Sequence, residues 1–284
     1  MKRVAMIGVV LTVATCSYAQ ADKPATQTPP AQPGAAAAAT PQAKRPPQAK
    51  TQAEFDAYKA VVALTDAPAA EKASDDFATK FPDSELRLML YKATMRSYQR
   101  TGNSDKIVEM GRKGLAIDAD DPELLVTVAS ELAEKTRDTD LDKDQRLDEA
   151  MKMAQKAIQT VDTDVPIPPN TPQEQIDAYK GQLHSFAYSI IGTLEFKRDN
   201  FAAAEADLRK SIDAYPSQPD PVVLLRLAIS LDRQSKYPEA LKEASRAVEL
   251  TKDDNGAGKL ARQERDRLTQ LVPGAAKPPD QPKN

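Results

Sequence analysis

The sequence predicts an all-α fold built from about five two-helix hairpins, and three observations lead to this prediction. Apolar and small residues recur at intervals of three and four, which places them on one face of a helix. In four of the five units, a second helical face follows the first after the same 12 residues. Prolines are rare inside the proposed helices and common between and beyond them.

The clearest copy of the repeated unit lies at 188–216. Its first helix carries four pattern positions spaced 3, 1 and 3, and its second helix carries three spaced 4 and 3. In order, these are Tyr188, Ile191, Gly192 and Glu195, followed by Ala204, Leu208 and Ser211. The small side chains of Gly192 and Ala204 would allow the two helices to approach closely where they cross.

Four further copies share this arrangement. Gly192 and Ala204 are 12 residues apart, and the same separation joins Ala228 to Ala240, Met95 to Ile107, and Val61 to Ala73. A fifth copy begins near Ala129, but its second helix starts near Ala150, so nine residues are inserted in its turn. The anchors at 61, 95, 129, 192 and 228 differ by 34, 34, 63 and 36, and the long interval also contains a 20-residue spacer.

Turn and capping residues set the expected helix ends. Pro82, Asp83 and Ser84 separate the first two hairpins, Gly102 marks the turn inside the second hairpin, and Pro122 suits a first helical position. The expected helices are 52–64, one ending at 80, 85–100, one ending at 117, 122–136, 144–161, 173–198, 201–214, 221–233, 238–251 and 257–271.

The last expected helix suits a cap for the array. It places Leu260, Leu268 and Leu271 on one side and charged residues on the other. A terminal cap is needed because the end unit of a stack exposes apolar surface.

The N-terminal residues 1–21 are predicted to be a secretory signal peptide. Lys2 and Arg3 precede an apolar run at 4–13, and small residues follow around Ala19. Cys16 leaves two alternatives open: removal with this peptide, which we favour, or acylation at a lipobox-like site. No stretch of the chain is apolar and long enough to span a membrane as a helix.

The composition divides the rest of the chain into an ordered domain and two tails. Residues 22–51 are rich in Pro, Ala, Gln and Thr, so they are expected to form a disordered linker. Residues 273–284 are expected to form a disordered tail, which leaves 52–272 as the helical repeat domain.

Charge and composition exclude several classes of function. The formal charge is −3, and removal of Lys2 and Arg3 changes it to −5, so a nucleic-acid-binding protein is not expected. His184 is the only histidine and Cys16 the only cysteine, so His/Cys metal sites and Ser-His-Asp catalysis lack their parts. We predict no catalytic residue, no cofactor and no metal ion.

One acidic segment, 138–149, allows a different interpretation. Its carboxylates Asp138, Asp140, Asp142, Asp144 and Glu149 stand at the ligand spacing of an EF-hand calcium loop. Lys143 occupies the place where that loop needs glycine. The alternative is an acidic insertion that favours the start of a helix.

The unit at 188–216 resembles the tetratricopeptide repeat, a 34-residue pattern of aromatic, Leu-Gly, aromatic, Ala, aromatic or Leu, and Pro. The resemblance covers about 52–252 and implies a right-handed α-solenoid. The sequence departs from the pattern where Thr94 and Met95 replace Leu-Gly. The segment FPDSEL at 81–86 resembles the repeats of outer-membrane assembly lipoproteins.

The resemblance also implies a concave groove, lined by the first helix of each hairpin, that binds a partner. By repeat position, the candidate partner-binding residues are Lys92, Arg96, Arg100, Val126, Ser130, Ser189, Thr193, Phe196, Leu225, Arg226, Ile229 and Arg233. In some family members, Lys, Arg and Asn side chains of this groove hold the C-terminal carboxylate of a peptide. Lys92 and Arg226 match two such positions, but the asparagines are missing, so a full clamp is not expected.

We therefore expect a non-enzymatic scaffold, periplasmic or secreted, that binds a peptide or helix of another cell-envelope protein. The first alternative is a lipid-anchored lipoprotein of an outer-membrane assembly or envelope complex, indicated by Cys16 and by 81–86. The second is a calcium- or small-ligand-binding protein that uses 138–149.

Overall fold

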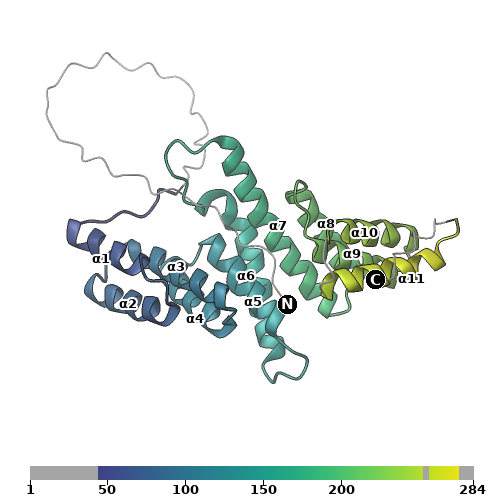
Figure 1. Ribbon diagram of the computed structural model, residues 1–284, viewed down its shortest axis with the longest axis horizontal. Coiled ribbons are helices and arrows are strands. Elements are labelled where there is room, and N and C mark those ends of the chain that lie inside the picture. The colour runs from purple at the N-terminus through teal and green to yellow at the C-terminus, as the bar shows by residue number, and fades with distance from the viewer. Residues whose placement is uncertain (1–43, 252–255, 275–284) are drawn as a thin grey trace, which may run out of the picture. The chain divides into compact units, whose positions relative to one another are not determined.

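The computed structural model describes residues 44–251 and 256–274, and this part of the chain folds into eleven α-helices without a β-strand (Figure 1). The helices are α1 (Gln52–Val62), α2 (Ala67–Lys80), α3 (Leu86–Thr101), α4 (Ser104–Leu115), α5 (Pro122–Lys135), α6 (Lys143–Asp164), α7 (Gln173–Lys197), α8 (Phe201–Ala214), α9 (Pro221–Arg233), α10 (Tyr237–Leu250) and α11 (Gly256–Leu271). The all-α prediction is confirmed, and every predicted helix end lies within three residues of its observed position.

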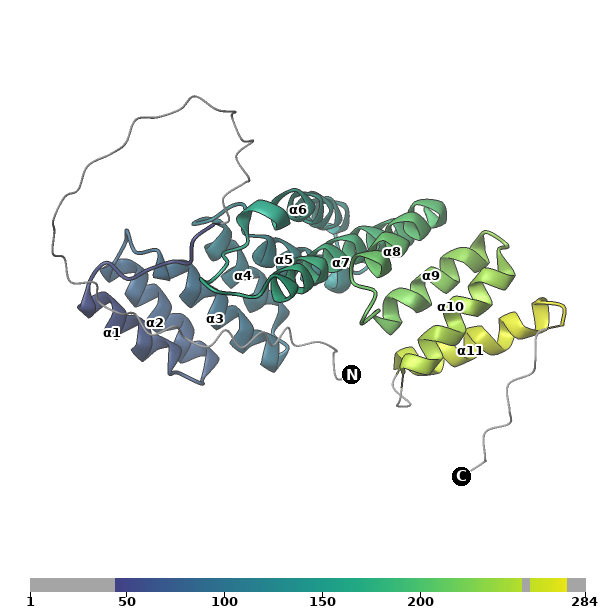
Figure 2. The ribbon, with the colours of Figure 1, turned by 90° about the horizontal axis from the view of Figure 1, so that it is seen from above.

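Consecutive helices pack as hairpins in the pairs α1/α2, α3/α4, α5/α6, α7/α8 and α9/α10. Each hairpin packs on the next, because α2, α4, α6 and α8 contact the first helix of the following hairpin. The last helix, α11, lies against α9 and α10 (Figure 2). The prediction of five hairpins and a capping helix is therefore confirmed.

The turns and caps explain where the helices begin and end. Asp121 caps α5 by accepting a hydrogen bond from the Leu124 amide at 3.0 Å, and Pro122 occupies the first helical position. Gly102 ends α3 with a φ of 71°, a left-handed conformation that glycine adopts without steric cost.

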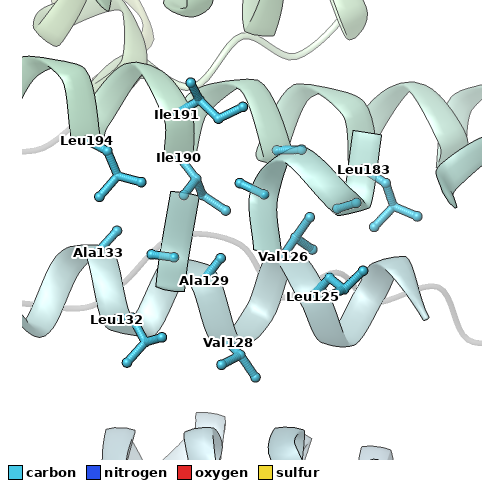
Figure 3. Close-up of a cluster of buried hydrophobic side chains, with 14 of the residues drawn as sticks. Leu125, Val126, Val128, Ala129, Leu132, Ala133, Leu183, Ile190, Ile191 and Leu194 are labelled. Atoms are coloured by element: carbon cyan, nitrogen blue, oxygen red, sulfur yellow. The ribbon is translucent and has the colours of Figure 1, made fainter. Parts of the chain in front are cut away.

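The largest apolar cluster joins α5, α6 and α7. Its alanines are Ala129, Ala133, Ala150, Ala154, Ala157 and Ala187, and its larger members include Leu125, Leu183, Ile190 and Leu194. Figure 3 shows Leu183, Ile190 and Leu194 of α7 pointing toward α5. Full burial of a leucine side chain contributes about 1.5–3 kcal/mol, so this cluster is a main source of the stability of the array.

The close crossing of α7 and α8 follows the sequence prediction. A Cβ atom on Gly192 would lie 2.7 Å from Cγ of Leu208, which is shorter than a carbon–carbon contact allows. Ala204 is completely buried on the facing helix. These two small residues therefore set the distance between the helices.

The capping helix α11 uses a different face from the one expected. Ala261 and Leu268 are buried, because residues seven apart return to the same side after about two turns. Leu260 and Leu271 are 56% and 44% exposed. The expectation that they share the capping side with Leu268 is wrong, since each is rotated away from the face that meets α9 and α10.

Residues 44–51 lie against the repeat domain, although their composition placed them in the expected linker. The Lys44 side chain pairs with Asp118, and the Lys44 carbonyl accepts a hydrogen bond from the Ile167 amide at 3.2 Å. Arg45 pairs with Glu85 at 2.5 Å. The linker prediction is corrected for these residues, because charged groups in the turns of the domain bind their side chains.

The remaining tail predictions fall mostly outside the described residues. These are the signal peptide at 1–21, the linker up to 43 and the tail from 275 onward. Within the described ranges, no helix combines the length and the apolar character needed to cross a membrane.

Candidate protein-interaction surface

The candidate residues all lie on the first helices of the hairpins, and we call the surface of α1, α3, α5, α7 and α9 the first-helix wall. The candidates are Lys92, Arg96 and Arg100 on α3, Val126 and Ser130 on α5, Ser189, Thr193 and Phe196 on α7, and Leu225, Arg226, Ile229 and Arg233 on α9. They do not share one environment: some make contacts that hold neighbouring helices together, and others stay exposed.

Lys92 belongs to the candidates that hold neighbouring helices together. It is only 7% exposed, and its Nζ lies 2.8 Å from Asp121 Oδ2 and 2.7 Å from Glu123 Oε2 at the start of α5. Burial acts to lower the pKa of Lys92, but Glu123 and Asp121 outweigh it and raise the pKa. Lys92 therefore stays charged and ties α3 to α5.

Glu123 extends this network to Arg96 and Tyr179. Arg96 Nη2 lies 2.6 Å from Glu123 Oε1, and the Tyr179 hydroxyl donates to Glu123 Oε2 at 3.5 Å. Burial and the charge of Glu123 raise the pKa of Tyr179, so its hydroxyl remains a donor. Through Glu123, the helices α3, α5 and α7 are joined by polar contacts.

A second network surrounds Arg226. Its Nη2 lies 2.7 Å from Glu134 Oε1 of α5, and its Nη1 donates to Thr193 Oγ1 of α7 at 3.0 Å. Lys197 of α7 donates to the Ala133 carbonyl near the end of α5, and burial lowers the pKa of Lys197. Arg226 and Thr193 therefore connect three first helices to one another.

The remaining α5 and α9 candidates differ in exposure. Val126 and Leu225 are buried in apolar clusters, and Ile229 packs partly against one of them. Ser130 is half-buried. Arg233 is exposed, and its guanidinium lies over the Phe201 ring at 5.8 Å.

The two remaining α7 candidates are half-buried. The Ser189 hydroxyl donates to the Phe186 carbonyl at 2.8 Å. Phe196 meets Phe201 edge-on, with ring centroids 5.8 Å apart. Phe196 therefore lies in the same aromatic group as Arg233.

A cavity of about 170 Å³ opens at the α1 end of the wall. It is lined by Val61, Val62, Leu64, Ala70, Ala93, Thr94, Arg96, Ser97 and Arg100. The sequence pattern identified Arg96 and Arg100 as candidates but did not reveal the cavity beside them. A signal was present, because Ala93 and Ser97 form a row of small residues beside the row of Arg96 and Arg100, each at a spacing of four.

The acidic segment does not have the geometry of a calcium loop. Residues 143–149 are helical, because α6 begins at Lys143. Asp138 pairs with Lys143, and Glu149 pairs with Arg112, at 2.7 Å and 2.8 Å. Within 44–251 and 256–274, no three His, Cys, Asp or Glu residues are grouped to hold a metal ion. The calcium-loop interpretation of 138–149 is therefore wrong in geometry.

A larger cavity, of about 580 Å³, lies between the acidic segment and the turn that follows α3. Its lining mixes charges of both signs, including Asp105, Lys135 and Arg137. Arg146 and Asp142 in its wall are paired with each other at 2.7 Å. This mixture favours no single ligand class.

His184 lies on α7 in a half-buried position. Its Nε2 is 3.4 Å from Asp162 Oδ2, and its ring is stacked on Tyr188 with centroids 6.4 Å apart. These contacts link α7 to α6 and bring no nucleophile to the imidazole.

Comparison with known proteins supports the fold. No family model and no curated protein matches the sequence. Among solved structures, PilF of Pseudomonas aeruginosa is 18% identical to this chain and has a TM-score of 0.51. The match covers 78% of this chain and 95% of the PilF chain.

Two other matches have lower TM-scores. PilW, a type IV pilus biogenesis factor, is 18% identical, and the match covers 78% of this chain and 92% of the PilW chain with a TM-score of 0.49. A TPR protein of Thermus thermophilus is 15% identical, and the match covers 74% of this chain and 98% of that protein with a TM-score of 0.46. The hairpin array and the likeness to PilF together show that this chain has the fold of the tetratricopeptide-repeat proteins.

Proposed function

We propose that this protein is an exported, non-enzymatic scaffold of the bacterial cell envelope that binds a peptide or helix of another protein on the first-helix wall. The fold supports this proposal, because stacked hairpins bury their contact faces and leave an extended surface for a partner. The wall carries polar, aromatic and aliphatic side chains, and the sequence has only one histidine and one cysteine from which to build a catalytic or metal site.

The observation that carries the proposal is that the wall residues fall into two groups, one that joins neighbouring first helices and one that stays available to a partner. Lys92, Thr193 and Arg226 hold neighbouring first helices together, so the wall is pre-ordered. Arg100 and Arg233, in contrast, form no ion pair within the described part of the chain. A pre-ordered surface lowers the entropy cost of binding, and unpaired cations give it selectivity.

We assign partner contact to the exposed and half-exposed candidates, and a supporting role to the buried ones and to the half-buried Arg226, which joins three first helices. The contact group is Arg96, Arg100, Ser130, Ser189, Phe196, Ile229 and Arg233. The supporting group is Lys92, Val126, Thr193, Leu225 and Arg226.

Photo-crosslinking in the producing cells tests this assignment. A photoreactive residue at Ser130 or Ile229 should yield a crosslinked protein partner, because both positions lie on the first-helix wall. The same residue at Ala203 or Lys242, which are exposed on α8 and α10, serves as the control. Equal crosslinking from wall and control positions, or none from the wall, contradicts the proposal.

Export is supported by the charged start, the apolar run at 4–13 and the small residues near Ala19. The second candidate, a lipid-anchored scaffold, is favoured by Cys16. Intact-mass measurement of the mature protein separates the two. A chain beginning near Gln20 or Asp22 supports a protein without an anchor, and an acylated Cys16 supports the lipoprotein.

A further inference from the structure

We propose that the cavity at the α1 end of the first-helix wall binds a partner segment in which an aliphatic side chain stands beside a carboxylate. This inference rests on the proposed scaffold function and names the chemistry and docking position of its partner.

The apolar half of the site comes from the end of α1. Val62 and Leu64 are 48% and 37% exposed, although both are large aliphatic residues. They border the cavity together with the buried Val61 and Ala70. Because α1 is the first helix of the described residues, no earlier helix within 44–251 and 256–274 covers this edge. An aliphatic side chain placed here would remove apolar surface of both molecules from water.

The size of the cavity follows from the small residues on α3. Ala93 and Ser97 lie one helical turn apart and face the end of α1 across the cavity. Its volume of about 170 Å³ is several times the roughly 30 Å³ that one water occupies in the liquid. It therefore has room for an aliphatic side chain of a partner.

The polar half of the site is Arg100. Its Nη2 donates to Ser97 Oγ at 2.7 Å, and it forms no ion pair within 44–251 and 256–274. Arg96, the neighbouring arginine, is already bound to Glu123 at 2.6 Å. Arg100 is thus an exposed guanidinium without a counter-charge at the rim of an apolar cavity.

This charge decides the chemistry of the occupant. No acidic side chain lines the cavity, so a basic segment would be repelled by Arg100 and a neutral one would leave its charge unpaired. A carboxylate can accept two parallel hydrogen bonds from a guanidinium, which is the strongest pairing open to this side chain. The site therefore selects an acidic group next to an aliphatic one.

Selection from a displayed library of random linear peptides tests the proposal with the full chain as bait. Enriched peptides are expected to place Leu, Ile, Val or Met beside Asp, Glu or a terminal carboxylate. Fluorescent synthetic copies then give dissociation constants by anisotropy. Arg100→Glu and Val62→Asp should each weaken binding about tenfold, because they remove the two halves of the site.

Two matched variants away from the wall control for general effects of surface changes. Lys242→Glu reverses an exposed cation on α10, and Leu250→Asp changes an aliphatic residue that is 47% exposed on the same helix. Neither should alter binding. A peptide whose acidic residue is replaced by lysine should bind Arg100→Glu better than the wild-type chain, because the charges are exchanged.

The outcomes separate this inference from the scaffold function. Peptides that bind Arg100→Glu and wild type equally but lose affinity for Arg233→Glu overturn the cavity assignment and leave the scaffold function standing. Enrichment of basic peptides also overturns the assignment. A library that yields no binding peptide contradicts the cavity assignment, and crosslinking from Ser130 and Ile229 then decides on the scaffold function.

Discussion

Arg226 of α9 and Glu134 of α5 form an ion pair of 2.7 Å, although 92 residues and the whole α7/α8 hairpin separate them in the chain. Arg226 also donates to Thr193 of α7, so one side chain joins three successive first helices. Repeat arrays are held mainly by contacts between nearest neighbours. This pair adds a contact between hairpins that are not neighbours, and it should couple their local stabilities.

Glu134→Gln is expected to weaken that coupling. Both side chains are partly exposed, so the loss in the free energy of unfolding should be about 0.5–1 kcal/mol. Hydrogen exchange measured by mass spectrometry should show faster exchange in α9 and unchanged exchange in α3. Glu239→Gln, which breaks a pair with Arg209 between α8 and α10, is the control. Equal exchange in α9 of the two variants would contradict the coupling.

The Lys92–Glu123 contact should make stability depend on acid pH. Burial acts to raise the pKa of Glu123, but Lys92 and Arg96 outweigh it and lower the pKa to about 2. The unfolded-state pKa is about 4.3, so the folded state binds this proton less tightly than the unfolded state does. The stabilising contribution of the pair is therefore fully present above the unfolded-state pKa of about 4.3, and it is lost as the pH falls toward 2. Its size is on the order of 3 kcal/mol.

Glu123→Gln should accordingly flatten the pH dependence of the free energy of unfolding between about pH 4 and pH 2. Urea denaturation at a series of pH values measures this slope. Glu149→Gln, in an exposed pair with Arg112, serves as the control and should keep the wild-type slope. A Glu123→Gln variant with the wild-type slope would show that the pair does not govern acid stability.

The fold could be predicted because its cause is local in the sequence. Gly192 and Ala204 sit 12 residues apart, and that spacing places two small residues at the helix crossing where Leu208 packs. The same logic fails for α11, where Leu260 and Leu268 read as one face but only Leu268 is buried. Periodicity identifies a helix, and the packing partner decides which side is covered.

The candidate site could be predicted only in part, because the partners of its charges are remote. Repeat position places Lys92 and Arg226 on the first helices, and the structure has them there. Their partners Glu123 and Glu134 lie 31 and 92 residues away, which no local pattern encodes. The same limit hid the exposed Leu64 beside Arg100, since it lies in a different hairpin.

Gly192→Ala tests the close crossing of α7 and α8. The added Cβ would lie 2.7 Å from Leu208 Cγ and 3.1 Å from the Leu208 amide nitrogen, so the helices must move apart. Overpacking of this kind costs about 1–3 kcal/mol, which exceeds the gain in helix propensity from glycine to alanine. Thermal denaturation should therefore show a lower Tm. Gly256→Ala, which has open space around its Cβ, should not lower it.

Residues 44–50 are expected to stabilise the repeat domain, which two truncated chains can measure. The buried Glu54 carboxylate accepts a hydrogen bond from the Lys50 amide at 2.7 Å, and Arg45 pairs with Glu85. A chain that begins at residue 51 keeps the Thr51 cap of α1 but loses these contacts. It should be less stable than a chain that begins at 44 by about 1–3 kcal/mol, because a buried carboxylate loses a donor. The chain that begins at 44 should match one that begins at 22 in Tm. If the chains beginning at 44 and 51 melt together, these contacts add nothing to stability.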